Sequence, residues 1–443
     1  MRWFLLATLC ATVVASCKNP AAPREPNKFA SQATFIRRLD SIRVGNATIL
    51  LSSGAMRNAL SLPSGDLLFV GELERPGAPR TAFAIRTNAV GGTRWARLYA
   101  DSIETFAAIV PSGERDFIAV GSVFSGPNQT SGYAIKIDSL GGTLWARSFS
   151  DAPRSLRFAG AIRQANGNAL LYGQTRRVVS AQSSLFINDG YVAAIDANGN
   201  AIFARRIRSL GSLSNTPSAD IGFNGGASVG ADAILAGFYT PIYDFVKAGV
   251  RRLVAPDLYL LRLNATGDST ASFLYDALYP AGDVLDQSVS YQGKLNTADE
   301  ALSILPMSDG TFAVFGRSNA SLYLLFVNAS LNGVLRRVVI PNVPSRFFSQ
   351  FALARDGNFV FVGASTEKIA QNGIRSPAPG GRDVYIAKMT PQGNLIWEIT
   401  HGTTFDDIGL TIQETIDGGF IVTGTSNDKP LLLKVDERGL LAQ

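Results

Sequence analysis

The chain has 443 residues, of which 46% are hydrophobic and 17% are charged, with 43 glycines and a net charge of +6. This composition is typical of a folded, turn-rich protein and excludes a largely disordered chain. The basic excess lies on scattered Arg residues without a concentrated basic and aromatic patch, so nucleic-acid binding is not expected.

The N-terminal segment has the pattern of an export signal. Arg2 is followed by an apolar stretch from Trp3 to Ala15, which is too short to span a bilayer and is typical of a signal peptide. The residues VASC, ending at Cys17, resemble the lipobox of bacterial lipoproteins. This resemblance implies cleavage before Cys17 and attachment of acyl chains such as palmitate to it. The alternative is an ordinary secretory signal that happens to contain a cysteine.

Three segments are therefore predicted: a signal peptide over 1–16, the lipidated Cys17 with a flexible tether over 17–33, and one folded domain over 34–443. Cys10 would leave with the signal peptide, so the mature protein would keep no thiol for a disulfide, a metal or a nucleophile. No other apolar segment is long enough to be a transmembrane helix. The predicted location is the cell envelope, through a lipid anchor in a membrane.

Two short patterns then alternate along the chain. The first, a polar turn and an apolar run ending in Gly, occurs seven times, from SLPSGDLLFVG (61–71) to TIDGGFIVTG (415–424). The second joins two strands through a glycine turn, as in AIKIDSLGGTLWARSF (134–149). Its turns are centred on Gly92, Gly142, Gly199, Gly267, Gly333, Gly393 and Gly439. A spacing of roughly 45 to 70 residues is that of a four-stranded blade, so the sequence predicts an all-β, seven-bladed β-propeller.

The last unit lacks its outer strand, which we denote d in the order a, b, c, d. The segment VGNATILLSSG (44–54) looks like a strand d with no blade before it. We therefore expect this N-terminal strand to complete the last blade and close the ring, which removes the open sheet edges. The segment FIRRLD (35–40) looks like a strand c and competes with LLLKVD (431–436) for that place. An incomplete eighth blade is the alternative.

The last unit, FDDIGLTIQETIDGGFIVTGTSNDKPLLLKVDERG (405–439), resembles the repeat of secreted and lipid-anchored propellers abundant in Bacteroidetes. The matching residues are Asp417, Gly418, Gly419, Gly424, Lys434, Asp436 and Gly439. Units between 200 and 340 match poorly. A weaker similarity is to quinoprotein-like propellers, including a lipoprotein scaffold of outer-membrane assembly. The resemblance implies an envelope propeller, with the outer membrane favoured. The metal and cofactor centre of the quinone dehydrogenases is not found, so no cofactor is expected.

Residues that recur at one place in successive units favour structural roles. An aromatic residue recurs in strand d, at Trp95, Trp145, Trp397, Phe203 and Phe273. It is predicted to pack blade against blade, with sugar stacking as the alternative. An Asx residue recurs before the turn glycine, at Asp138, Asp196, Asp436, Asn264 and Asn328. It is predicted to accept hydrogen bonds from backbone amides rather than to bind calcium.

One face of the ring is predicted to carry the function. In an antiparallel blade the a–b and c–d turns share one face, and the b–c and d–a connections share the other. The longest connections belong to the second face and lie at 174–190, 207–220, 238–257, 275–299 and 364–383. Insertions gathered on one face often mark the binding face.

Two of these loops carry residue types common in binding hot spots. The first, over 238–257, contains Tyr239, Tyr243, Phe245, Arg251 and Arg252. The second, over 274–294, contains Tyr279, Tyr291, Asp276, Asp283 and Asp286. Solvated loops without a partner are the alternative.

Charged residues near the start of strand a would lie at the channel mouth on the same face. The acidic ones are Glu104, Asp220, Glu300 and Asp407, and the basic ones are Arg57 and Arg157. This ring of mixed charge either holds a polar ligand or neutralises itself. The candidate ligand-binding set is Glu104, Asp220, Tyr239, Tyr243, Arg251, Arg252, Glu300 and Asp407.

The favoured function is binding or scaffolding in the cell envelope, with a protein or glycan partner. A polysaccharide hydrolase at the channel mouth is the alternative, with Asp406 and Asp407 or Asp299 and Glu300 as paired carboxylates. A purely structural role is the third possibility. The single histidine, His401, is expected in a loop, and no nucleophile motif surrounds any serine. No catalytic residue, metal ligand or cofactor is therefore expected.

Overall fold

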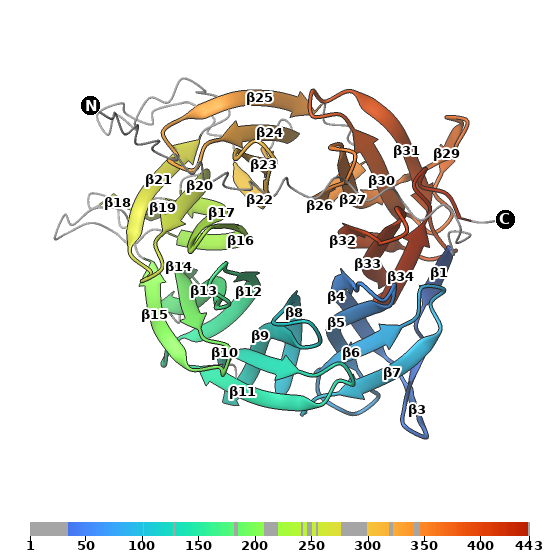
Figure 1. Ribbon diagram of the computed structural model, residues 1–443, viewed down its shortest axis with the longest axis horizontal. Coiled ribbons are helices and arrows are strands. Elements are labelled where there is room, and N and C mark those ends of the chain that lie inside the picture. Colours follow the sequence, from blue (N-terminus) through green and yellow to red (C-terminus); the bar gives the residue numbers. More distant parts are fainter. Residues whose placement is uncertain are drawn as a thin grey trace, which may run out of the picture.

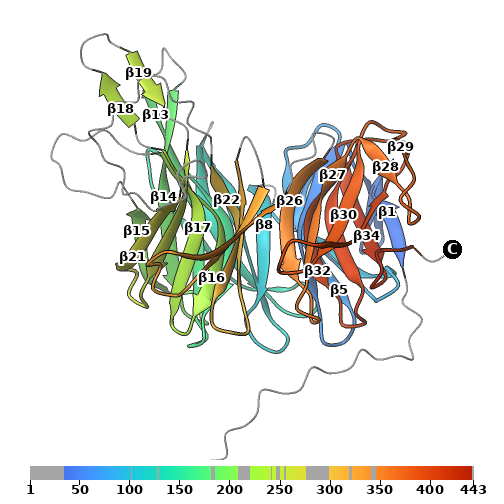
Figure 2. The ribbon, with the colours of Figure 1, turned by 90° about the horizontal axis from the view of Figure 1, so that it is seen from above.

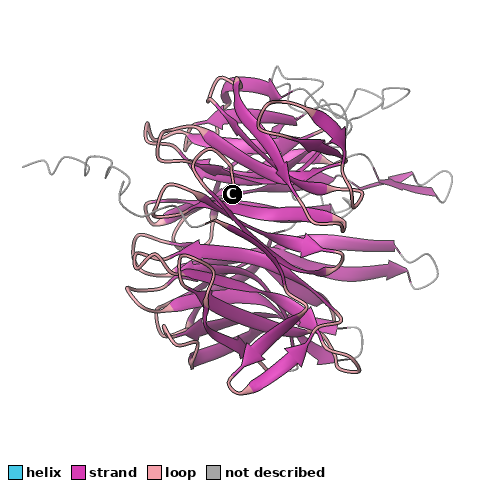
Figure 3. Cartoon of the chain, turned by 90° about the vertical axis from the view of Figure 1, so that its right-hand side faces the viewer, coloured by secondary structure: helices cyan, strands magenta, loops and turns pink. Residues whose placement is uncertain are grey.

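The computed structural model describes residues 34–100, 102–126, 129–180, 185–207, 220–240, 242–245, 250–253, 256–275, 299–318, 322–340 and 346–441. Within these ranges, seven four-stranded antiparallel sheets stand around a central axis as the blades of a β-propeller (Figure 1). The described residues form strands joined by loops and turns (Figure 3). The predicted fold class is confirmed. The predicted signal peptide, Cys17 and the tether lie outside the described residues.

Each blade runs from an inner strand a to an outer strand d. The inner strands are β4 (Ser53–Ser61), β8 (Ile103–Pro111), β12 (Ser155–Arg163), β16 (Asp220–Val229), β22 (Glu300–Pro306), β26 (Arg346–Leu353) and β32 (Asp407–Glu414). The b strands are β5 (Leu67–Glu74), β9 (Phe117–Gly126), β13 (Ala169–Ser180), β17 (Asp232–Thr240), β23 (Phe312–Arg317), β27 (Phe359–Ser365) and β33 (Phe420–Ser426).

The c strands are β6 (Thr81–Thr87), β10 (Gln129–Ile137), β14 (Leu185–Ile195), β20 (Asp257–Leu263), β24 (Leu322–Val327), β30 (Asp383–Met389) and β34 (Lys429–Val435). The outer d strands are β7 (Thr93–Leu98), β11 (Thr143–Phe149), β15 (Ala201–Ile207), β21 (Ser269–Tyr275), β25 (Val334–Ile340), β31 (Leu395–His401) and β1 (Phe35–Arg38). Three accessory hairpins complete the fold: β2 (Ser41–Val44) with β3 (Ala47–Leu50), β18 (Ile242–Phe245) with β19 (Val250–Leu253), and β28 (Glu367–Ile369) with β29 (Arg375–Pro377).

Every inner strand has a β-bulge, and in all blades but blade 5 it explains the glycine that ends the predicted apolar run. In blade 6 the register shifts between Phe348 and Gln350, next to the pair Phe348–Gly363. A Cβ on Gly363 would lie 1.7 Å from the carbonyl oxygen of Phe347. Because the bulge brings the backbone of strand a this close to strand b, only glycine fits there.

The apolar core lies between the blades. Among the described residues it divides into seven clusters, and each contains side chains from two adjacent blades. Between blades 6 and 7, for example, Val362 and Ile386 pack with Val422 and Leu433. Each blade therefore buries its two faces against its neighbours, and the ring needs every junction to be filled.

The recurring aromatic residue of strand d packs against the next blade, as predicted. The Trp95 Nε1–H donates to the Ser139 carbonyl at 3.0 Å, and its ring covers Gly141 in the c–d turn of blade 2. Trp145 covers Gly199 and Trp397 covers Gly439 in the same way. Two turn centres were misplaced by one residue, because the positive φ in the Gly-Gly pairs falls on Gly91 and Gly141 rather than on Gly92 and Gly142.

An N-terminal strand completes the last blade, but it is β1 rather than the predicted segment 44–54. β1 pairs with β34, and Phe35 lies opposite Lys434, as Trp397 lies opposite Lys388. The Phe35 ring also covers Gly91 of blade 1, so it fills the aromatic position of strand d. Residues 35–38 are thus a strand d and not a strand c. The segment 44–54 contributes instead to the β2–β3 hairpin and to the start of β4.

Candidate functional site

The two faces of the ring differ in regularity. The face with the a–b and c–d turns, here called the tight-turn face, carries only short connections in the described residues. The opposite face, here called the long-loop face, carries all three accessory hairpins. In blade 3, β13 and β14 extend to 12 and 11 residues. The β18–β19 hairpin and the end of β13 project beyond the rest of the molecule on this side (Figure 2).

Repeated ion pairs hold the tight-turn face together. In five blades an Asp at the a–b turn pairs with a basic residue of strand c, as Asp66–Arg86, Asp116–Lys136, Asp232–Arg262, Asp356–Lys388 and Asp417–Lys434. Lys434 also donates to the Ala89 carbonyl of blade 1 at 3.3 Å. Burial raises the pKa of Asp417, but the hydrogen bond and charge of Lys434 bring it below the usual value. Asp417 and Lys434, which carry the family resemblance, are therefore structural.

The Asx residues before the turn glycines accept hydrogen bonds from backbone amides, as predicted. Asp138 Oδ1 accepts from the amides of Leu140 and Gly142, both at 2.8 Å. Asp196, Asp436 and Asn264 make the same pair of contacts in their own turns. Asn328 departs from the prediction, because its turn is one residue longer and its Nδ2 donates to Asn332 Oδ1 instead.

His401 is the last residue of β31 rather than a loop residue. Its Nε2–H donates to the Gly439 carbonyl of blade 7 at 2.6 Å, and burial lowers its pKa. Tyr99, four residues after Trp95, donates in the same way to the Gly141 carbonyl of blade 2 at 3.2 Å. His401 therefore joins two blades, in a position that a tyrosine takes elsewhere.

Charged residues near the starts of the inner strands form ion pairs. Glu104 accepts from Arg157 Nη2 at 2.8 Å and from the Ser122 hydroxyl at 2.7 Å, which joins blade 2 to blade 3. Arg57 binds Glu72 in blade 1 through Nε at 2.9 Å. Much of the predicted mixed charge is thus neutralised by contacts within or between neighbouring blades.

The other three predicted carboxylates have separate surroundings. Glu300 pairs with Arg317 of its own blade. Asp220 Oδ1 accepts from the backbone and side-chain nitrogens of Asn188, both at 2.9 Å, and burial raises its pKa. Asp407 is fully buried, while its neighbour Asp406 binds Arg382 Nε at 2.8 Å. The structure therefore places these carboxylates in different junctions rather than in one shared cluster.

The predicted aromatic and basic residues of 238–257 fall on two elements. Tyr239 belongs to strand β17, and its ring packs against Tyr259 at 5.7 Å between centroids. Tyr243 and Arg252 are backbone partners across the β18–β19 hairpin, next to the pair of Asp244 with Arg251. The side chains of this hairpin, and the predicted loop residues Asp276, Tyr279, Asp283, Asp286 and Tyr291, lie outside the described residues.

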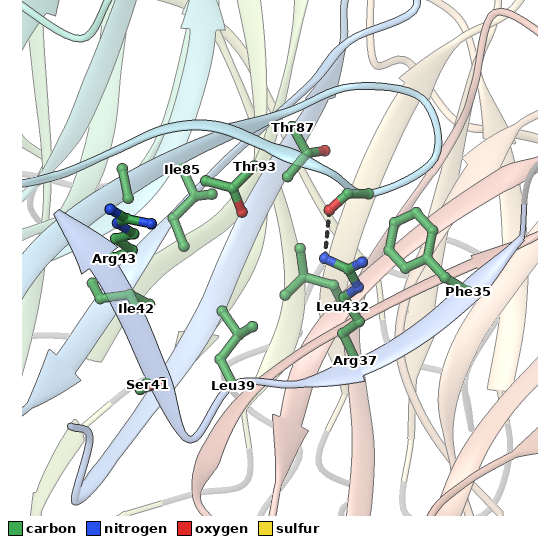
Figure 4. A pocket seen from close by; sticks show the side chains of 12 residues that line it. Phe35, Arg37, Leu39, Ser41, Ile42, Arg43, Ile85, Thr87, Thr93 and Leu432 are labelled. Carbon is green, nitrogen blue, oxygen red and sulfur yellow. Dashed lines mark hydrogen bonds between the residues drawn. The ribbon is translucent and has the colours of Figure 1, made fainter. Parts of the chain in front are cut away.

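A small pocket of about 80 Å³, which sequence reasoning missed, lies where β1 meets blade 1. Ile42, Ile85 and Leu432 form apolar walls, and Arg37 and Arg43 lie on either side of them (Figure 4). Arg37 donates to the Gly91 carbonyl at 2.6 Å. The only sequence signal for this seam is the similarity of FIRR, starting at Phe35, to FARR, starting at Phe203.

No protein-family model matches the chain, and no curated protein matches it. Similar solved structures include a Dos1 propeller, with 9% identity over 92% of this chain and 97% of that one and a TM-score of 0.42. They also include a puromycin hydrolase, with 13% identity over 87% of this chain and 52% of that one and a TM-score of 0.49. YCF48 bound to a D1 peptide has 9% identity over 93% and 97%, with a TM-score of 0.47.

These likenesses concern the fold alone and carry no argument about activity. The Bacteroidetes-type lipoprotein resemblance remains a prediction from the sequence. Within the part of the chain that the structure describes, no helix has the length and apolarity needed to cross a bilayer.

Proposed function

We propose that the protein is a lipid-anchored binding or scaffolding module of the cell envelope, which engages a partner protein through its long-loop face. The observation that supports this proposal is the difference between the two faces. Seven blades with uniform tight turns on one side carry three accessory hairpins and an extended β13–β14 pair on the other. Elaborated connections on a rigid scaffold are the usual location of binding residues.

The direction of β1 also favours the long-loop face as the one that meets a partner. As the d strand of blade 7, β1 begins at Phe35, opposite Lys434 and beside Gly91, both at the tight-turn side. The tether from Cys17 would therefore join the ring on the tight-turn face. A lipid anchor at Cys17 would then attach on the side opposite the long-loop face, so the attachment itself does not cover that face. The family resemblance favours the outer membrane.

Hydrolysis is the less favoured function, because Glu300 is engaged by Arg317 and Asp407 is buried. A retaining or inverting glycosidase needs two carboxylates that face one substrate. In the first predicted pair, Asp406 is bound to Arg382 beside the buried Asp407. In the second, Glu300 is bound to Arg317 beside the buried Asp299.

The test is in-cell crosslinking of the tagged full-length protein, followed by mass spectrometry of what co-purifies. In the trimmed variant an Asn-Gly turn replaces residues 241–255, which removes β18–β19 but keeps β17 and β20. A matched control shortens the β28–β29 tip over 370–374, on the same face but in blade 6. We expect one stoichiometric envelope protein with the full-length and control proteins, and its loss with the trimmed variant.

Two results would overturn the proposal. A partner that the trimmed variant retains would show that β18–β19 is not the contact, and the absence of any protein partner would remove the scaffolding role. The Cys17→Ser variant tests the anchor separately. It is expected to move from the membrane fraction to the soluble envelope fraction, and continued membrane association would refute lipidation at Cys17.

A further inference from the structure

Two buried carboxylates meet at the junction of blades 6 and 7, on the side of the long-loop face. Asp383 is the first residue of β30 and Asp407 is the first residue of β32. Asp383 is 2% exposed and Asp407 is 0% exposed. Asp407 lies close enough for its charge to disfavour the ionised form of Asp383.

One turn after β31 contacts both carboxylates. A Cβ on Gly402 would lie 2.1 Å from Asp383 Oδ1, so this oxygen lies against the Gly402 backbone. The next residue, Thr403, donates from its amide and its hydroxyl to Asp407 Oδ2, at 2.5 and 2.9 Å. The two side chains therefore occupy the same small space between the blades.

Each carboxylate keeps one oxygen that nothing satisfies. Asp383 Oδ1 and Asp407 Oδ1 are both inaccessible to solvent and have no hydrogen-bond partner. No ion pair neutralises either group among the described residues. Lys368 acts on Asp383 only through its charge, and the nearby Arg382 is bound to Asp406. Ionised carboxylates buried in this way are strongly unfavourable unless a positive group compensates them.

Three residues that pair with or bind the two acids carry hydroxyls. Ser365 is the cross-strand partner of Asp383, and Ser426 is that of Asp407. Both serines are fully buried, and the Thr403 hydroxyl lies 3.3 Å from the Ser426 hydroxyl. Cross-strand neighbours lie within about 5.5 Å of each other at Cβ. The junction thus offers two carboxylates and three hydroxyls, an all-oxygen set of the kind that hard cations prefer.

The junction of blades 3 and 4 also holds two carboxylates, but nitrogen donors bind them. Asp189 occupies the strand position of Asp383 and lies opposite a buried threonine, whereas Asp220 lies one residue before the position of Asp407. There, Arg154 pairs with Asp189, and Asn188 donates twice to Asp220. An arginine pairs with one acid of that junction, whereas no lysine or arginine of the described residues forms an ion pair with Asp383 or Asp407.

We infer that a divalent cation of the calcium class binds between Asp383 and Asp407, with neutral oxygens of the junction completing its shell. Two carboxylates match its charge. The described residues hold no group of three or more acidic, imidazole or thiol ligands, so neutral oxygens must supply most of the coordination. Sites with few charged ligands bind calcium weakly, in the range of about 10⁻⁴ to 10⁻³ M that suits extracellular modules. This inference does not depend on the proposed partner.

The test measures thermal unfolding of the detergent-solubilised full-length protein at neutral pH, in EDTA and in millimolar CaCl2. Binding to the native state only should raise Tm steadily with calcium concentration, by about 3 °C at millimolar calcium. Asp383→Asn and Asp407→Asn should abolish this rise. Asp189→Asn, a matched change in the junction of blades 3 and 4, should lower Tm but retain the calcium response.

A second measurement needs no variant. Isothermal titration of CaCl2 into the EDTA-treated and dialysed wild-type protein should give one site per chain. No heat of binding, together with the same Tm in EDTA and in calcium, would overturn the inference. In that case a proton shared by the two carboxyls would be the compensating group, and Asp407→Asn would raise Tm in EDTA. A calcium response that survives both Asn variants would also overturn it.

Discussion

The tight-turn face and the long-loop face are built by the same seven blades but differ in how far their residues repeat. On the tight-turn face one interaction recurs, as in Asp66 with Arg86. On the long-loop face the junctions differ from one another, since Arg154 pairs with Asp189 whereas no basic side chain in the described residues forms an ion pair with Asp383. Residues that repeat hold the ring together, and residues that break the repeat are the candidates for individual functions.

The largest effect is expected where a repeated ion pair also closes the ring. Lys434 is 1% exposed, lies 2.5 Å from Asp417 and reaches blade 1 at Ala89. Lys434→Met leaves the Asp417 carboxylate without its partner, so the free energy of unfolding should fall by about 3–5 kcal/mol. Urea unfolding measures this. Arg438→Ala breaks an exposed pair with Asp436 on the same face and should change little. An equal fall in the free energy of unfolding for the two variants would show that the strength of these ion pairs does not depend on burial.

A smaller but still large effect is expected at the bulge. Gly363→Ala places a methyl group against the Phe347 carbonyl, so strand a must shift, and the free energy of unfolding should fall by about 3 kcal/mol. Gly113→Ala is the matched control, because nothing lies within 4 Å of its Cβ position and its effect should stay within about 0.5 kcal/mol. A Gly363→Ala protein as stable as wild type would disprove the steric account of the repeated glycine.

The smallest effect concerns pH and the long-loop side. Burial and the charge of Asp407 raise the pKa of Asp383 to about 6, against the lowering effect of Lys368. The folded protein therefore binds this proton more tightly than the unfolded chain does. In EDTA, stability should fall by about 2 kcal/mol as the pH rises from about 4 to about 6, and should stay low above that.

The difference in the free energy of unfolding between wild type and Asp383→Asn separates the contribution of Asp383 from those of the other acids. It should grow over that pH range in EDTA and shrink when calcium is added. Parallel pH curves for the two proteins would contradict the assignment of the proton to Asp383.

The repeats made the blades, the two faces and the roles of the turn residues predictable, because each blade is a local unit of adjacent strands. The closing strand was not predicted correctly. β1 has only four residues and precedes Asp40, so it shares the ending of a strand c, and only Phe35 marks it as a strand d. The contacts of the candidate site could not be predicted from the sequence either. The pairing of Glu104 with Arg157, for example, depends on how two blades pack together.

The closing strand also determines when the ring can be completed. Arg38 of β1 donates to the Ser426 carbonyl, 388 residues further along the chain. At ordinary synthesis rates these two residues emerge about 20 to 80 s apart. During that interval β1 has no partner strand, while blades 1 to 6 gain their strands one after another. β1 and the face of blade 1 that packs against blade 7 therefore stay uncovered until β33 and β34 have been made, and closure of the ring is a late step in folding.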